Sequence, residues 1–169
     1  MSNGLALAAA CLAPLLTLLS AQRASVLVLS HLTWFDRAGS SLGRLGPLAD
    51  HGNIELSPDG SRVAVAVTDR GRGTRDIWMY RTADGRREQF TADPADENWL
   101  IWSPDGSRVA INSFSRDGIG LFEAPAAGSE PRSALVSHSE GIWPVSWSPN
   151  GQFILYVTNS RETSNDVWV

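Results

Sequence analysis

The sequence predicts an all-β protein, a partial and open β-propeller of four-stranded antiparallel blades with an apolar N-terminal helix, and three observations predict it. The 169 residues include 15 glycines, 9 prolines and 7 tryptophans, a composition typical of short strands joined by tight turns. A Ser-Pro-Asp/Asn-Gly segment occurs three times, opening at Ser57, Ser103 and Ser148, which lie 46 and 45 residues apart. A short apolar run follows each segment, so the repeated unit has the length of a propeller blade.

The chemistry of the repeated segment indicates strands rather than helices on either side of it. Proline fixes φ at the second position of a turn, and glycine supplies the left-handed conformation two positions later. The runs that follow, residues 63–67, 109–111 and 153–157, are rich in β-branched or aromatic side chains. Two-helix solenoid repeats, the main alternative at this period, would not carry such turns.

Each unit can be divided into four strands, A to D, with the repeated turn between A and B. The expected strands are 99–102 and 143–147 for A, 63–67, 109–111 and 153–157 for B, 76–80, 120–123 and 165–169 for C, and 88–91 and 133–136 for D. Residues 31–36 and 42–45 fit strands C and D of a preceding blade. Residues 25–169 are therefore expected to hold half a blade, two complete blades and three strands of a further blade.

An apolar segment, residues 1–24, precedes this region. Gly4 to Ala21 is mostly apolar, is interrupted by Pro14 and is closed by Gln22 and Arg23. It could be a signal peptide or a membrane anchor, but no basic residue precedes it, so we weigh export equally against a buried helix or a misplaced start. A periplasmic or extracytoplasmic location is slightly favoured on this basis.

Composition excludes several classes of function. A formal net charge of -4 argues against nucleic acid as a partner, because affinity for phosphate backbones requires clustered positive charge. All 14 basic residues are arginine, so there is no lysine for a phosphate loop, a kinase strand or a Schiff base. Cys11 is the one cysteine, which excludes an internal disulfide and a cysteine metal cluster. We expect no cofactor.

From about residue 31 to residue 169 the sequence resembles the bacterial WD-like propeller repeats typified by TolB. The resemblance rests on the Ser-Pro-Asp-Gly turn and on an Asp-x-Trp strand, present as residues 76–78 and 166–168. Residues 32–39 most resemble the propeller at the carboxyl end of bacterial transmembrane serine/threonine kinases, and similar repeats cover the catalytic domain of prolyl-oligopeptidase-type enzymes. Gly120 replaces the strand aspartate in the middle blade and Asn150 replaces the turn aspartate in the last, so neither aspartate is common to every blade.

Motifs that carry chemistry elsewhere have plainer interpretations here. Residues 39–43 match the G-x-S-x-G nucleophile elbow, but the glycines and proline that follow exclude the required helix, so Ser41 is expected in a hairpin. The three histidines are spread one per unit and are expected to be solvated or capping residues rather than metal ligands. The acids of residues 93–97 form a polar turn more readily than an acid–base pair. The recurring tryptophans are expected to pack between blades.

Antiparallel order places the B–C and D–A loops at one end of every blade, and we call this end the loop face. It comprises residues 69–75, 115–118 and 159–165 together with 50–53, 93–98 and 138–141. Its mixture of arginines and acids suits a polar protein or peptide partner, although solvation alone explains it equally well. The candidate binding residues are Asp50, His51, Arg72, Arg75, Asp93, Asp96, Glu97, Arg116, His138, Glu140 and Arg161.

The leading hypothesis is a non-catalytic propeller module for protein or peptide interaction or for ligand sensing, within a larger chain or assembly. The alternative is the accessory propeller of a serine/threonine kinase or a prolyl-oligopeptidase-type peptidase whose catalytic domain is encoded nearby, and a gene remnant without function is a third possibility. Propellers have four to eight blades, so self-association through open blade faces is also expected. A membrane contact is expected only through the N-terminal segment.

Overall fold

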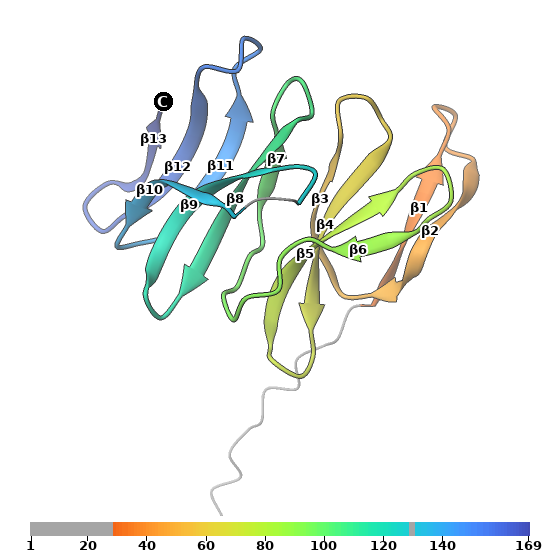
Figure 1. The fold of residues 1–169 in the computed structure, drawn as a ribbon, viewed down its shortest axis with the longest axis horizontal. Helices are drawn as coiled ribbons and strands as arrows, with labels where there is room; N and C mark the ends of the chain where they lie inside the picture. Colours follow the sequence, from red (N-terminus) through yellow and green to blue (C-terminus); the bar gives the residue numbers. More distant parts are fainter. Residues whose placement is uncertain (1–28, 129–130) are drawn as a thin grey trace, which may run out of the picture.

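A computed structural model describes residues 29–128 and 131–169, and it is all-β over those residues. The strands form four antiparallel sheets, two of them four-stranded, which confirms the predicted class (Figure 1). The sheets are β1 (Ser30–Phe35) and β2 (Ser41–Ala49); β3 (His51–Leu56), β4 (Arg62–Asp69), β5 (Thr74–Arg81) and β6 (Arg87–Gln89); β7 (Leu100–Trp102), β8 (Arg108–Ser115), β9 (Gly118–Pro125) and β10 (Ser133–His138); and β11 (Ile142–Trp147), β12 (Ile154–Ser160) and β13 (Ser164–Trp168).

The apolar helix expected in residues 1–24 lies outside the described residues, and so does the expected boundary between residues 1–24 and 25–169. Within the described residues, no helix is long and apolar enough to span a membrane.

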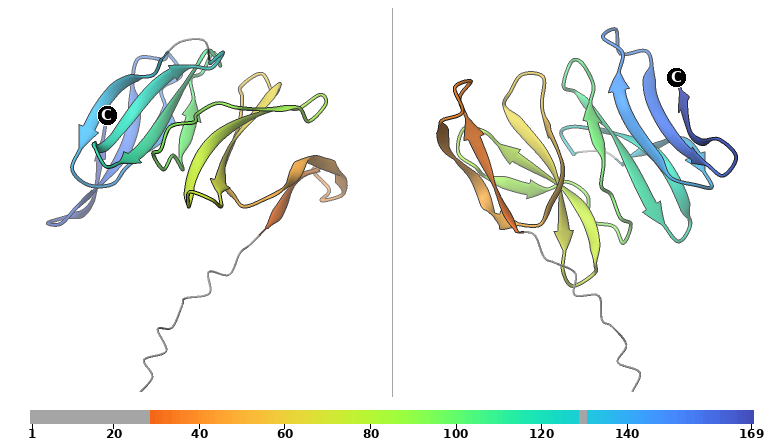
Figure 2. Two further views of the ribbon diagram at one scale, coloured as in Figure 1. Left: turned by 60° about the horizontal axis from the view of Figure 1, so that its bottom comes forward. Right: turned by 180° about the vertical axis from the view of Figure 1, so that it is seen from behind.

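The four sheets stand side by side in chain order, with β1–β2 at one end and β11–β13 at the other. The views of Figures 1 and 2 agree that the two end sheets do not meet, so the described sheets form an open arc. Each sheet is a meander in which sequential strands are neighbours, as the repeated turns require.

Hydrogen bonds within the repeated turn explain its sequence. At the first copy, Gly60 has a φ of 71° and its amide donates to the carbonyl of Ser57 at 2.8 Å, so the position favours glycine. The Ser57 hydroxyl donates to Asp59 at 2.6 Å and accepts from the amide of Arg62 at 2.9 Å. The bonds that Asp59 accepts from the Ser57 hydroxyl, which is the main cause, and from the amide and hydroxyl of Ser61 lower the pKa of Asp59 to about 2. In the third copy Asn150 keeps the arrangement, because its amide oxygen accepts from Ser148 at 2.7 Å.

The core lies between consecutive sheets rather than in one central cluster. Leu32 and Leu45 of the first sheet pack against Val63 and Val65 of the second. The opposite face of the second sheet, including Ile77, packs against a cluster from the third sheet that comprises Leu100, Trp102, Val109, Ile111, Ala124 and Ala126. A third cluster joins the third sheet to the fourth. Each blade is thus stabilised by its neighbours.

Some expectations are corrected at the strand ends. Residues 50–53 were expected to be a loop, but β2 continues to Ala49 and β3 begins at His51, so the loop is short. The tryptophans do not all pack between blades: Trp102 is buried, whereas Trp99 and Trp168 are exposed. Trp168 is exposed because β13 has no described strand on its outer edge. Ser41 is the first residue of β2 and pairs with Phe35 across a hairpin, as predicted.

Candidate functional site

The loop face brings five of the predicted residues together where the second sheet meets the third. They are Arg72 and Arg75, from the β4–β5 connection and the start of β5, and Asp93, Asp96 and Glu97, from the β6–β7 loop. We call them, with Asp76 and Arg132, the interblade ion network.

Arg75 and Asp96 form the best-aligned pair in the network. The guanidinium donates two bonds, from Nε to Oδ1 at 2.8 Å and from Nη2 to Oδ2 at 2.6 Å, and the Arg75 amide donates to the same carboxylate at 2.9 Å. Burial acts to raise the pKa of Asp96, but these bonds outweigh it and the pKa lies below its usual value. Since Asp96 also exchanges two backbone bonds with Phe114, at 2.9 and 3.0 Å, the pair fastens the β6–β7 loop to both neighbouring sheets.

Glu97 is the most buried acid of the network, with a fully covered side chain. Arg132, from the loop before β10, donates to its Oε1 and also pairs with Asp93 at 2.8 Å. The other carboxylate oxygen, Oε2, is buried without a hydrogen-bond partner in the structure. Burial raises the pKa of Glu97 to about 7, because Arg132 does not fully compensate the loss of solvent.

Arg72 binds a second buried acid. Its guanidinium donates to Asp76 and to Asp69, the latter at 3.0 Å, and to the backbone oxygen of Asp93 at 3.0 Å. Asp76 is buried and also accepts from Gln89 at 3.1 Å. Burial is the main reason that the pKa of Asp76 is raised. The charged groups of the network therefore bond chiefly to one another, and their role is to hold the second and third sheets together.

The predicted residues at the start of β3 lie beside the first sheet. The backbone oxygen of Asp50 accepts from the amide of Thr68 at 3.0 Å. The His51 ring nitrogen Nδ1 is 3.1 Å from the hydroxyl of Ser30, and burial is the main cause of a lowered pKa for His51.

The remaining predicted residues lie toward the other end of the arc. Arg161 pairs with Glu140 at 3.2 Å but is almost fully exposed, so the pair contributes little to stability. The amide of Glu140 donates to His138 at 3.1 Å, which makes His138 a loop-capping residue. Arg116 is exposed in the β8–β9 turn. No ion pair or hydrogen bond of the described residues links these four to the interblade ion network. In the same residues, no three potential metal ligands converge.

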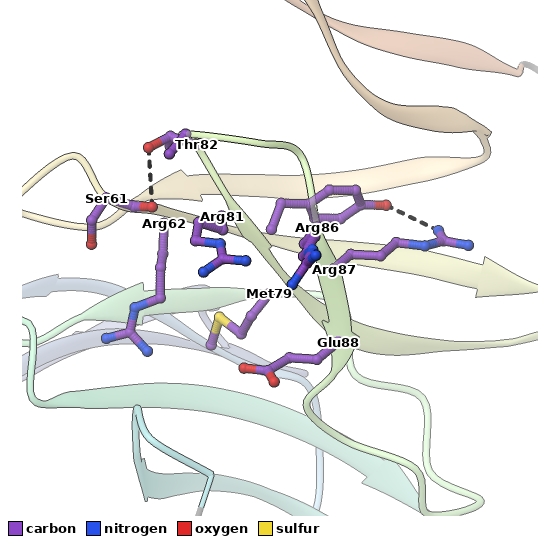
Figure 3. A pocket seen from close by; sticks show the side chains of 10 residues that line it. Ser61, Arg62, Met79, Arg81, Thr82, Arg86, Arg87 and Glu88 are labelled. Atoms are coloured by element: carbon purple, nitrogen blue, oxygen red, sulfur yellow. Dashed lines mark hydrogen bonds between the residues drawn. The ribbon is translucent and has the colours of Figure 1, made fainter.

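A pocket that the sequence did not suggest lies at the opposite end of the second blade (Figure 3). It has a volume of about 590 Å³ and is formed by the A–B turn and the β5–β6 connection. We call it the arginine pocket. Its lining residues are Ser61, Arg62, Met79, Tyr80, Arg81, Thr82, Ala83, Arg86, Arg87 and Glu88.

Contacts hold two of the pocket arginines in place, Arg62, which is half-buried, and Arg87, which is exposed like the other two. Arg62 donates to the carbonyl of Ala126 at 2.6 Å and lies 4.9 Å from the Trp102 ring centre. Arg87 donates to the Tyr80 hydroxyl at 3.1 Å, a bond drawn in Figure 3. The exposed pair, Arg81 and Arg86, shares Asp84, at 2.7 and 3.7 Å.

Comparison with solved structures identifies the architecture. A putative TolB from Agrobacterium tumefaciens matches with a TM-score of 0.57 at 20% identity, over 71% of this chain and 41% of that one. TolB from Acinetobacter baumannii matches with a TM-score of 0.56 at 14% identity, over 70% of this chain and 29% of that one. The fold is TolB-like. Hydrazine synthase from Kuenenia stuttgartiensis also matches this chain, with a TM-score of 0.57 at 13% identity over 76% of this chain and 42% of that one.

Sequence comparison finds a relative that is named as a peptidase rather than as a TolB. The "Uncharacterized peptidase YuxL" of Bacillus subtilis is 29% identical over 113 residues, which are 64% of this TolB-like chain and 17% of the relative. The chain therefore spans less than a fifth of that relative and less than half of the TolB structures. No protein-family model matches the chain. The particular resemblance to kinase-linked propellers stays a prediction.

Proposed function

We propose that this TolB-like chain is a non-catalytic interaction module that binds an acidic protein segment or peptide at the arginine pocket. The observation that carries the proposal is charge: four arginines line the pocket, against Glu88 in the lining and Asp84 beside it, in a chain whose net charge is -4. Guanidinium groups bind carboxylates with two parallel bonds. Arg62 is held against the third sheet and Arg87 against Tyr80 on the other face of the second sheet, so the exposed Arg81 and Arg86 are the groups that would contact the peptide. The loop-face residues of the sequence analysis are the second candidate surface, but Arg72 and Arg75 pair there with buried or half-buried acids, whereas Arg81 and Arg86 share the exposed Asp84.

Fluorescence anisotropy with a labelled glutamate-rich decapeptide tests the pocket. Arg86 is the residue to change, because its side chain is 82% exposed and its loss leaves the fold intact. We expect Arg86→Ala to weaken binding by about two- to fivefold, the usual effect of one exposed ion pair. Binding should also weaken as salt is raised from about 50 to about 300 mM.

Arg116→Ala is the matched control, since it removes the same charge from an exposed turn at the other end of a blade. The control should bind the acidic peptide as the unaltered chain does, and a lysine-rich decapeptide should bind none of the proteins at the pocket. Equal losses in both variants, or equal binding of the two peptides, would exclude the pocket as the site.

One observation favours the alternative function, an accessory propeller of a peptidase. It is the similarity to the peptidase-named relative, of which this chain spans 17%. In that case the module would control access to a catalytic domain encoded beside it. Reading the flanking genomic sequence tests this: a downstream nucleophile elbow followed by a helix supports it, and flanking sequence without any hydrolase or kinase motif contradicts it.

A further inference from the structure

Arg81 and Arg86 of the arginine pocket stand opposite each other across the β5–β6 hairpin. The amide of Arg81 donates to the carbonyl of Arg86 at 2.7 Å, and the amide of Gly85 donates to the carbonyl of Arg81 at 2.9 Å. Gly85 has a φ of 69°, so a tight turn holds the two arginines as neighbours. Like charges at opposite positions of paired strands destabilise a hairpin. The arginine pair is therefore unfavourable unless an anion lies close to both side chains.

Asp84, in the same turn, supplies one such anion. Arg81 Nε donates to Asp84 Oδ1 at 2.8 Å, and Arg81 Nη2 lies 2.7 Å from Asp84 Oδ2, so the carboxylate takes both arms of this guanidinium. Arg86 Nε lies 3.7 Å from the same Oδ2. The bond from Arg81 is the main cause of a lowered pKa for Asp84. Two guanidinium groups thus converge on one carboxylate, whose single charge compensates only one of them.

The other charges of the pocket do not remove this excess. Arg62 is held by two backbone carbonyls rather than by a carboxylate, at 2.6 and 3.4 Å. Glu88 is the one acid in the lining itself (Figure 3). Arg62, Arg81 and Arg86 therefore outnumber Asp84 and Glu88 by one charge. The pocket stays electropositive with its internal anion in place.

The contact between Arg81 and Asp84 can be exchanged for an external anion. The two side chains are 52% and 41% exposed, and an ion pair this exposed changes an equilibrium by about fivefold at most. Backbone bonds close the turn whether or not the ion pair is formed, and the Arg86 amide also donates to Asp84, at 3.1 Å. Asp84 is thus an internal competitor that an anionic ligand of Arg81 displaces.

We propose that the group that displaces Asp84 is the phosphoryl group of a phosphorylated protein segment. This inference rests on the proposed function and narrows its ligand. A carboxylate would take the place of Asp84 and again leave one guanidinium uncompensated. A phosphoryl group carries a charge of about -1.5 to -2 at pH 7 and three acceptor oxygens, so it can accept from Arg81 and Arg86 together.

Fluorescence anisotropy with three matched decapeptides tests the inference. They are the glutamate-rich peptide of the proposed function with phosphoserine, glutamate or serine at its central position. The phosphoserine peptide should bind about two- to fivefold more tightly than the glutamate peptide, the effect of one further exposed ion pair, and the serine peptide should bind least tightly. Arg86→Ala should bind the phosphoserine and glutamate peptides equally, whereas Arg116→Ala should keep the preference.

Asp84→Asn tests the internal competitor, because asparagine removes the charge and keeps an oxygen that accepts from the Arg86 amide. This variant should bind the phosphoserine and glutamate peptides about two- to fivefold more tightly. Asp117→Asn is the matched control, since it removes the same charge from the exposed β8–β9 turn and should leave both affinities unchanged. Equal effects of the two variants, or no gain in Asp84→Asn, would overturn the role of Asp84.

The outcomes separate this inference from the proposed function. Equal binding of the phosphoserine and glutamate peptides, with the glutamate peptide still weakened by Arg86→Ala, would overturn the phosphoryl group and leave the acidic-peptide site standing. Failure of both peptides to bind would overturn the site itself. Inorganic phosphate should displace the phosphoserine peptide only when it is in large excess, because it lacks the flanking segment. Displacement at the concentration of the peptide would show that a free anion suffices, and it would overturn the protein segment as the ligand.

Discussion

The buried carboxyl of Glu97 makes a quantitative prediction about stability and pH. Its pKa is raised from 4.5 to about 7 in the folded protein, chiefly by burial. A folded-state pKa above the unfolded one means that the folded protein holds the proton more tightly. The contribution of Glu97 to stability is therefore fully present below about pH 4.5 and is lost as the pH rises through about 7. The displacement from 4.5 to about 7 corresponds to about 3 kcal/mol once Glu97 is ionised in both states.

Glu97→Gln isolates this contribution. Glutamine keeps the shape of the side chain and an oxygen that can accept from Arg132, but it stays neutral at every pH. The variant should match the unaltered protein near pH 4.5 and exceed its free energy of unfolding by up to about 3 kcal/mol near pH 8. Urea unfolding at both pH values, followed by tryptophan fluorescence at one protein concentration, measures the difference. Asp76, whose pKa is also raised, cancels because it is present in both proteins.

Glu162→Gln is the control, since it makes the same substitution at an exposed loop position and should give the same difference in stability at both pH values. The reasoning is refuted if the Glu97→Gln difference is independent of pH. It is also refuted if the free energy of unfolding of the variant falls relative to that of the unaltered protein as the pH rises, since the ion pair with Arg132 would then outweigh the cost of burial.

Three further experiments test the packing. In urea unfolding, Gly46→Ala should lower the free energy of unfolding by about 2–4 kcal/mol and Gly60→Ala by about 1 kcal/mol. Both glycines have φ near 70°, but a Cβ at Gly46 would also lie 2.3 Å from the buried ring of Tyr80. Equal effects of the two substitutions would contradict this. A double-mutant cycle of Arg75→Ala and Asp96→Ala should give a coupling energy of about 1 kcal/mol that decreases with salt. Zero coupling would show that this ion pair does not stabilise the contact between the two sheets. Leu121→Ala should cost about 2–5 kcal/mol, whereas a smaller loss would mean that the third and fourth sheets pack loosely.

The strands of the two complete blades were predictable because local chemistry determines them. The expected runs at 63–67 and 76–80 lie within β4 and β5, since the turn before them and the alternation within them specify a hairpin. The exposed Trp168 was not predictable in this way. Its burial depends on which strands stand next to it, and the repeat pattern is the same whether a neighbour is present or not.

The candidate site was predictable in place but not in its partners. Antiparallel order correctly put Arg72, Arg75 and the acids 93–97 on one face. It did not reveal Arg132, which is 35 residues from Glu97 in the chain and reaches it only through the packing of adjacent sheets. The arginine pocket was missed although a signal was present: three arginines fall within residues 81–87, and these residues were treated only as a strand connection.

The near-equivalence of the contacts between sheets also bears on how such a protein can change in evolution. Val63 and Val109 meet the preceding sheet from corresponding positions, as do Ala64 and Ala110 the following one. A crossover between two copies of the repeat in a gene deletes or duplicates a whole blade. Wherever it occurs, the face of one blade that packs on the following sheet still meets a face of another blade that packs on the preceding sheet. Mutation by whole units therefore preserves the contacts between neighbouring sheets, so a lineage can change its number of blades without first passing through misfolded intermediates.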